Sequence, residues 1–206
     1  MKQTIITIAL FALASLTACS NGESSTDNSG SGPLSPLAEK YIGIAANDAE
    51  QREALKDLKG SSDMKEAEKI CNEFQAKNDA LQEEAKTLAE QMKGSKIPCN
   101  ASEATGLQNV ECTISGVNAK SSSANVVLNF KGASPFDGDY GCLFENEKGE
   151  VLAKLRTVSN GDGTLGVIYT LGTKNDGESS HIGSEITRVQ IVSLPEFEAA
   201  KTISKL

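Results

Sequence analysis

Apolar residues recur along the chain with two different periods, and the period changes near residue 96. Between residues 37 and 92 they recur every three or four positions, which places side chains such as Leu37, Tyr41 and Ile44 on one face of a helix. From Val110 onward they alternate with polar residues, as in a strand with one buried face. The pattern therefore predicts helices followed by strands, an α+β fold.

The segment 37–95 is predicted to form a helical hairpin. Its first 56 residues, 37–92, contain no proline and are rich in Ala, Glu, Lys and Leu, which favour helices. Gly60 to Asp63 divide the segment, since glycine ends helices and Ser or Asp caps the next one. Of the two core positions of a heptad, one is apolar along this segment, but the other carries charged and polar residues. We therefore expect the hairpin to pack on the following domain rather than to form a long coiled coil, and a stalk or a partner-binding helix is the alternative.

The segment 96–206 is predicted to be an antiparallel β domain, a sandwich or a small barrel of about six strands. Short apolar runs are separated by turn sequences such as Glu147–Glu150 and Asn160–Gly163. The pattern does not select between sandwich and barrel. The expected strands are 110–114, 125–131, 140–144, 151–158, 165–171 and 186–194.

The first 18 residues are organised like an export signal. Lys2 provides a positive charge, and the apolar run 5–16 is shorter than the roughly 20 residues that span a membrane. The sequence Leu16-Thr17-Ala18-Cys19 follows directly and resembles the lipobox of bacterial lipoproteins. The resemblance covers this segment alone. It implies removal of residues 1–18 and attachment of acyl chains to the sulfur of Cys19, with no further cofactor.

Residues 19–36 are predicted to be the lipidated cysteine and a flexible tether. They are mostly Ser, Gly, Asn, Asp and Pro, so the tether is expected to span roughly 20 Å. Ser20 resembles the residue that follows the cysteine in proteobacterial lipoproteins of the outer membrane. We expect an outer-membrane protein held by its lipid, on the periplasmic face or the cell surface.

The acidic composition limits the partners. The 206 residues carry a net charge of -8, and loss of Lys2 with the signal leaves 19 basic against 28 acidic residues, a net charge of -9. Phosphate backbones are bound by basic faces, so a nucleic-acid partner is not expected. We expect the membrane, through the lipid, and a protein or an envelope polymer as partners.

Four cysteines remain besides Cys19, and an exported chain with an even number of thiols is expected to form disulfides. A bond between Cys71 and Cys99 is disfavoured. A helix from Cys71 to Met92 is about 32 Å long, and the seven residues that follow return at most roughly 25 Å. The two pairings left are Cys99–Cys112 with Cys71–Cys142, and Cys71–Cys112 with Cys99–Cys142.

The usual catalytic and metal-binding constellations are incomplete. There is no Cys-x-x-Cys, and His181 is the single histidine, so we predict no metal site and no catalytic residues. We interpret His181 as an exposed loop residue. The alternative is an envelope hydrolase with a carboxylate or serine nucleophile, for which Asp137, Asp139 and Ser62 are the candidates.

One loop resembles a cation site. Asn160, Asp162 and Thr164 alternate with glycines, as in part of a calcium loop. The pattern of oxygen ligands stops early and lacks the glutamate of the twelfth position. We interpret these residues as a plain turn.

These features favour one function class. They predict a lipid-anchored lipoprotein of the cell envelope that acts as a non-enzymatic binding module, with a structural, inhibitor or immunity-like role.

Overall fold

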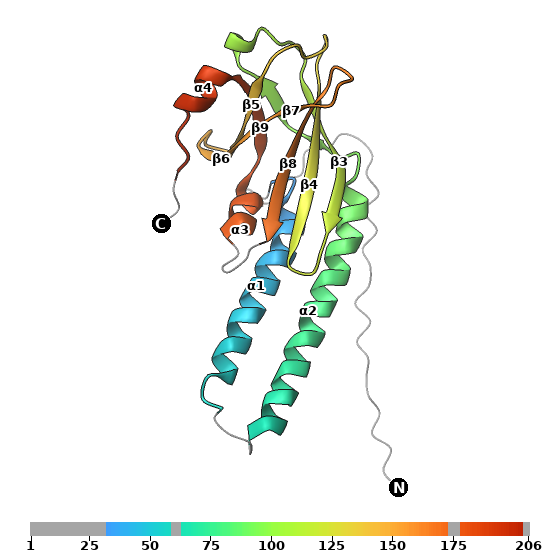
Figure 1. Ribbon diagram of the computed structural model, residues 1–206, viewed down its shortest axis with the longest axis vertical. Coiled ribbons are helices and arrows are strands. Elements are labelled where there is room, and N and C mark those ends of the chain that lie inside the picture. The colour runs from blue at the N-terminus through green and yellow to red at the C-terminus, as the bar shows by residue number, and fades with distance from the viewer. Residues whose placement is uncertain (1–31, 59–62, 173–177, 204–206) are drawn as a thin grey trace, which may run out of the picture.

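The computed structural model describes residues 32–58, 63–172 and 178–203. The signal segment, Cys19, most of the tether and Ser62 lie outside these residues. In the described part, a helical N-terminal region is followed by two mostly antiparallel sheets, which confirms the predicted α+β class (Figure 1). The helices are α1 (Ser35–Leu55), α2 (Met64–Met92), α3 (Glu178–Glu185) and α4 (Leu194–Ala199).

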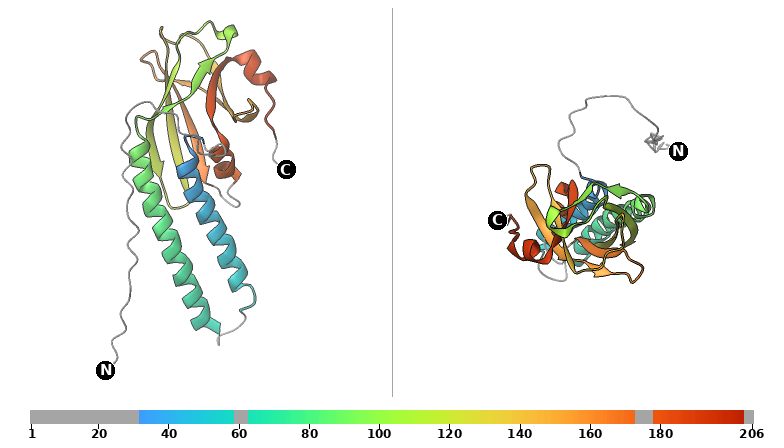
Figure 2. Two further views of the ribbon diagram at one scale, coloured as in Figure 1. Left: turned by 180° about the vertical axis from the view of Figure 1, so that it is seen from behind. Right: turned by 90° about the horizontal axis from the view of Figure 1, so that it is seen from above.

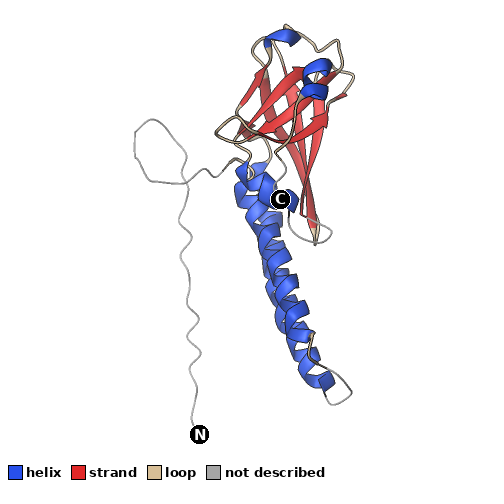
Figure 3. Ribbon diagram, turned by 90° about the vertical axis from the view of Figure 1, so that its left-hand side faces the viewer, coloured by secondary structure: helices blue, strands red, loops and turns tan. Residues whose placement is uncertain are grey.

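The two long helices pack on the sheets at one end only. The buried side chains of α1 end at Asn47, and those of α2 begin at Ala85. The rest of the hairpin runs away from the sheets, with the helices side by side (Figures 2 and 3). The expectation of packing on the β domain therefore holds for the near end of the hairpin alone.

A polar layer joins the two helices beyond the sheets. The amide of Asn47 is buried and donates hydrogen bonds to the Phe74 carbonyl (3.0 Å) and to Asn78 Oδ1 (2.7 Å). Asn78 in turn donates to Asp48 Oδ1 (2.7 Å). A buried amide is costly unless it is paired, so this layer favours one register of the two helices.

Two sheets follow the hairpin, and they do not close into one barrel. The first, sheet A, has the antiparallel order β1-β3-β4-β8-β7. The second, sheet B, has the order β2-β9-β5-β6, in which β2 and β9 are parallel. The strands are β1 (Lys96–Ile97), β2 (Cys99–Ala101), β3 (Glu111–Ala119), β4 (Ser123–Lys131), β5 (Tyr140–Glu145), β6 (Val151–Arg156), β7 (Val158–Ser159), β8 (Leu165–Gly172) and β9 (Arg188–Ser193), with a short 3-10 helix, η2 (Glu103–Thr105).

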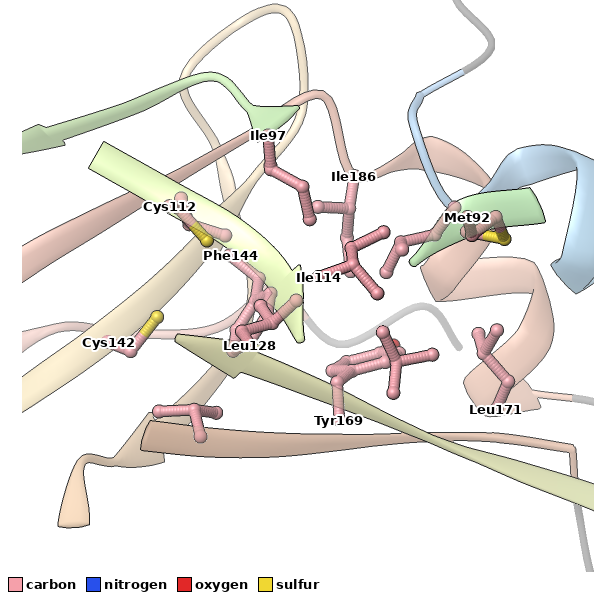
Figure 4. Close-up of a cluster of buried hydrophobic side chains, with 14 of the residues drawn as sticks. Met92, Ile97, Cys112, Ile114, Leu128, Cys142, Phe144, Tyr169, Leu171 and Ile186 are labelled. Atoms are coloured by element: carbon pink, nitrogen blue, oxygen red, sulfur yellow. The ribbon is translucent and has the colours of Figure 1, made fainter. Parts of the chain in front are cut away.

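One core joins the helices and both sheets. Phe130 of sheet A and Phe144 and Ile191 of sheet B belong to the same buried cluster, part of which Figure 4 shows. At the other end of sheet A, the helices replace sheet B as the cover. The Tyr41 hydroxyl donates to the Lys120 carbonyl (3.0 Å), beside the β3–β4 turn. The inner face of sheet A is thus covered by sheet B at one end and by helices at the other.

A β-bulge in β3 keeps its apolar residues on the inner face. Ile114 pairs with Leu128, but the next paired residue is Gly116, opposite Val127. The extra residue changes the side to which the strand's later positions point. Val117 therefore shares the inner face, where it packs against the core.

The outer face of sheet B is covered by α4. Phe197 packs on Leu143 and Val192, and an added Cβ at Gly141 would lie 2.2 Å from the Phe197 ring. Lys154 Nζ donates to the carbonyls of Phe197 (3.0 Å) and Ala200 (2.9 Å) at the end of the helix. A glycine in the strand therefore permits a close approach that a larger residue would prevent.

The predicted boundaries need three corrections. The predicted strand 151–158 is divided between β6 in sheet B and β7 in sheet A. Residues 32–36, expected in the tether, belong to the folded unit, because Leu34 is completely buried in the core and α1 begins at Ser35. The polar stretch around His181, expected to be a loop, is the helix α3. It forms there because Gly183 lets the helix approach β8, where an added Cβ would lie 2.2 Å from Leu171.

Candidate functional site

The candidates for hydrolysis are exposed and lie on separate elements. His181 is exposed on α3, while Asp137 and Asp139 are exposed in the loop between β4 and β5. Ser62 lies outside the described residues.

The histidine and the loop carboxylates are at opposite ends of β8. The Phe136 amide donates to the Gly163 carbonyl (3.1 Å), just before β8 begins. Ser180 Oγ accepts a hydrogen bond from the Gly172 amide (2.7 Å), where β8 ends. Eight residues of strand span roughly 26 Å at about 3.3 Å each. A proton relay needs hydrogen-bond distances, so this structure does not bring these groups into one site.

The loop that resembles a calcium site forms a turn held by its own side chains. Asp162 Oδ1 accepts hydrogen bonds from Thr164 Oγ1 (2.6 Å) and from the Thr164 amide (3.0 Å). These two bonds lower the pKa of the Asp162 carboxyl. Asn160 donates to Thr164 Oγ1 and to Asn129 Oδ1, both at 2.9 Å. Two of the side-chain oxygens of this loop, Asp162 Oδ1 and Thr164 Oγ1, thus take part in the turn.

Three of the predicted disulfide cysteines gather in the β domain, and the fourth does not. Cys99, Cys112 and Cys142 lie on β2, β3 and β5, and Figure 4 shows the Cys142 sulfur pointing toward Cys112. Cys71 lies in the N-terminal third of α2, which runs away from the sheets (Figure 1). All four are free thiols in this structure. Both predicted pairings need Cys71 beside a sheet cysteine, and the direction of α2 does not bring it there.

The three gathered thiols are weak nucleophiles. Burial raises the pKa of the Cys99 thiol to about 12. Burial also raises the pKa of Cys112 and Cys142, and the neighbouring thiols add to this effect. A thiol reacts as its thiolate, so these side chains behave as small apolar groups near neutral pH.

The described residues contain neither a membrane-spanning helix nor a metal-binding cluster. None of the helices there is long and apolar enough to cross a membrane. No group of three or more His, Cys, Asp or Glu side chains in the same ranges is placed to hold a metal ion.

Three hydrogen bonds converge on one carboxylate oxygen of Glu196. Its Oε2 accepts from Ser102 Oγ (2.6 Å), Ser193 Oγ (2.8 Å) and the Ser193 amide (2.9 Å). The Ser102 bond is the largest cause of a lowered pKa for this carboxyl, followed by the two bonds from Ser193. The Glu196 carboxylate caps α4 and links it to the segment before η2, which is a structural role.

Glu196→Gln is expected to reduce the free energy of unfolding by about 0.5–1 kcal/mol near pH 7, as loss of a helix cap does. The lowered pKa means that the stabilisation is present above the ordinary pKa of glutamate and is lost as the pH falls through the lowered value. The difference between wild type and variant should therefore shrink in acid. Urea unfolding at a series of pH values measures it. Glu90→Gln, an exposed change on α2, should show no such trend.

The remaining candidate is the surface of sheet A that faces away from the core. We define the outer face as the outward positions of β3, β4, β7 and β8 that lie between the charged pair Glu111 and Lys131 at one end and the pair Ser123 and Gly172 at the other. In Figure 1 these strands lie in front of α1, and none of the described helices lies in front of them. Besides Gly116 at the bulge, ten residues form the outer face: Thr113, Ser115, Asn118, Asn125, Val127, Asn129, Val158, Gly166, Ile168 and Thr170.

The strand register arranges the outer face in rows. The middle row pairs Gly116, Val127 and Ile168, and the rows beside it carry asparagine and threonine. Thr170 Oγ1 donates to Asn125 Oδ1 (3.0 Å) across the strands. The side chains of Ile168 and Val158 are 58% and 66% exposed, and they are two of the four exposed large hydrophobic side chains in the described chain.

None of the ten residues of the outer face carries a charge, although the chain is acidic. The sequence contained a signal for this face. In 165–171 the inward positions are apolar, and Ile168 is an apolar residue at an outward position, where the alternation requires a polar one.

No family model, characterised protein or solved structure matches the chain. The geometry of the chain itself is therefore the evidence for its function.

Proposed function

We propose that the protein is a lipid-anchored lipoprotein of the outer membrane that works as a non-enzymatic binding module, with the outer face of sheet A as its binding surface. In this proposal the two sheets act as a β-sandwich, a rigid frame that holds the face flat. The observation that carries the proposal is the uncharged outer face with Ile168 at its centre, which none of the described helices covers. Exposed apolar positions gathered on one surface mark interaction sites.

The tether supports this assignment by its point of attachment. The folded unit begins at Gly32, where an added Cβ would lie 1.6 Å from the Ile186 carbonyl oxygen. Gly32 thus lies against Ile186, which is part of the core and not of the outer face of sheet A.

Capture of partners in the envelope tests the proposal. Cells producing the tagged full chain are treated with formaldehyde, and the tagged protein is purified with its adducts. Wild type should return reproducible adducts, and Ile168→Lys should reduce them at least ~10-fold, because it places a charge in an uncharged contact. The matched control is Met64→Lys, since Met64 is 68% exposed at the start of α2 and far from sheet A. Absence of adducts, or equal adducts from Ile168→Lys and wild type, would contradict the proposal.

A further inference from the structure

We propose that the partner of the outer face is a second copy of this chain, so that two anchored copies pack sheet A against sheet A. The inference rests on the proposed function and specifies its partner. A pair related by a two-fold axis uses the same surface on both copies. The outer face must therefore be complementary to itself.

The described residues cover outward apolar side chains on sheet B but not on sheet A. On sheet B, α4 covers Leu143 and Val192, which are 6% and 2% exposed. On sheet A, Ile168 and Val158 have no comparable cover from the described residues. A second sheet A would bury the apolar row, and the Asn and Thr rows beside it both donate and accept hydrogen bonds.

Charge favours a second copy at this face. Two copies of a chain with a net charge of about -9 repel each other over most of their surfaces. The ten residues of the outer face add nothing to that repulsion. At one end of the outer face, Glu111 is paired with Lys96 (3.0 Å) and lies opposite Lys131 in the strand register. One acidic and two basic residues there add no net negative charge to the repulsion.

Other partners fit this chemistry less well. A strongly charged partner would be met by opposite charges, and the outer face has none. A sugar chain is usually held on aromatic rings, and none of the ten residues is aromatic.

The area of the face is sufficient for a weak pair. Four strands about 4.8 Å apart and about seven residues long cover roughly 400–500 Å² on each copy, or roughly 800–1,000 Å² in total. That total is below the area of a stable specific interface and is typical of weak, transient contacts. Anchoring both copies to one membrane raises their effective concentration, which suits a contact of this size.

Site-directed crosslinking of the full chain in cells tests the inference. Ile168→Cys places a thiol in the middle row, where equivalent residues of two copies meet near a two-fold axis. Treatment with a short bis-maleimide should give a band of twice the monomer mass. Two controls should give no such band. Met64→Cys places a similarly exposed thiol on the hairpin, and wild type controls for the native thiols. Co-capture of two differently tagged copies should fall at least ~10-fold with Ile168→Lys.

Each outcome of the crosslinking experiment supports or contradicts the pairing of two copies. No doubled band from Ile168→Cys, or an equal band from Met64→Cys, overturns the paired arrangement. An adduct of Ile168→Cys with a protein of another mass also overturns it, but leaves the outer face as a binding surface. If formaldehyde capture also returns no adduct of any kind, the proposed function fails with it.

Discussion

Cys19→Ala is expected to move nearly all of the protein from the membrane fraction to the soluble periplasmic fraction. The cysteine sulfur is the atom to which the lipobox resemblance assigns the acyl chains. Each buried acyl CH₂ contributes about 0.8 kcal/mol, so the loss of two or three chains removes the anchor.

Incorporation of radiolabelled palmitate, followed by fractionation, measures this effect. Wild type should carry the label and remain with the membranes, and Cys19→Ala should carry none. Cys71→Ala is the matched control, because it removes a partly exposed thiol of α2 and should leave label and location unchanged. An unlabelled wild-type protein in the soluble periplasm would refute the lipid anchor.

Phe144→Ala is expected to lower the free energy of unfolding by about 3–5 kcal/mol, as truncation of a fully buried Phe does. Phe144 is completely buried in β5, and its ring centroid lies 4.9 Å from that of Tyr169 in β8. The side chain therefore joins the two sheets directly. Its removal leaves a cavity at the point where they pack.

Urea unfolding followed by circular dichroism gives this value. Phe74→Ala is the matched control, because Phe74 is only partly buried on α2 and should cost clearly less. Phe144→Leu, which keeps most of the volume, should lose less than about 1.5 kcal/mol and remains measurable if the alanine variant does not fold. Equal losses for Phe144→Ala and Phe74→Ala would show that the sheets do not share one core.

The main elements were predictable because their signals are local. The helical period of 37–92 and the alternation of the six predicted strands each bury one face, and all of these elements are present. The short strands β1 and β2 were missed, since two or three residues contain no readable period, and the predicted strand 151–158 is divided between β6 and β7. The helix α3 was also missed, because its polar sequence is typical of a loop and its packing on β8 depends on Gly183.

The candidate site was predictable in its parts and not in its arrangement. The lipobox resemblance, the acidic charge and the inward alternation of β4 and β8 could be read from the sequence alone, because each depends on neighbours in the chain. Only the tertiary structure decided that Cys71 lies apart from the other thiols and that α4 covers sheet B, while none of the described helices covers the outer face of sheet A. Those outcomes depend on contacts between residues distant in sequence, which local periodicity does not encode.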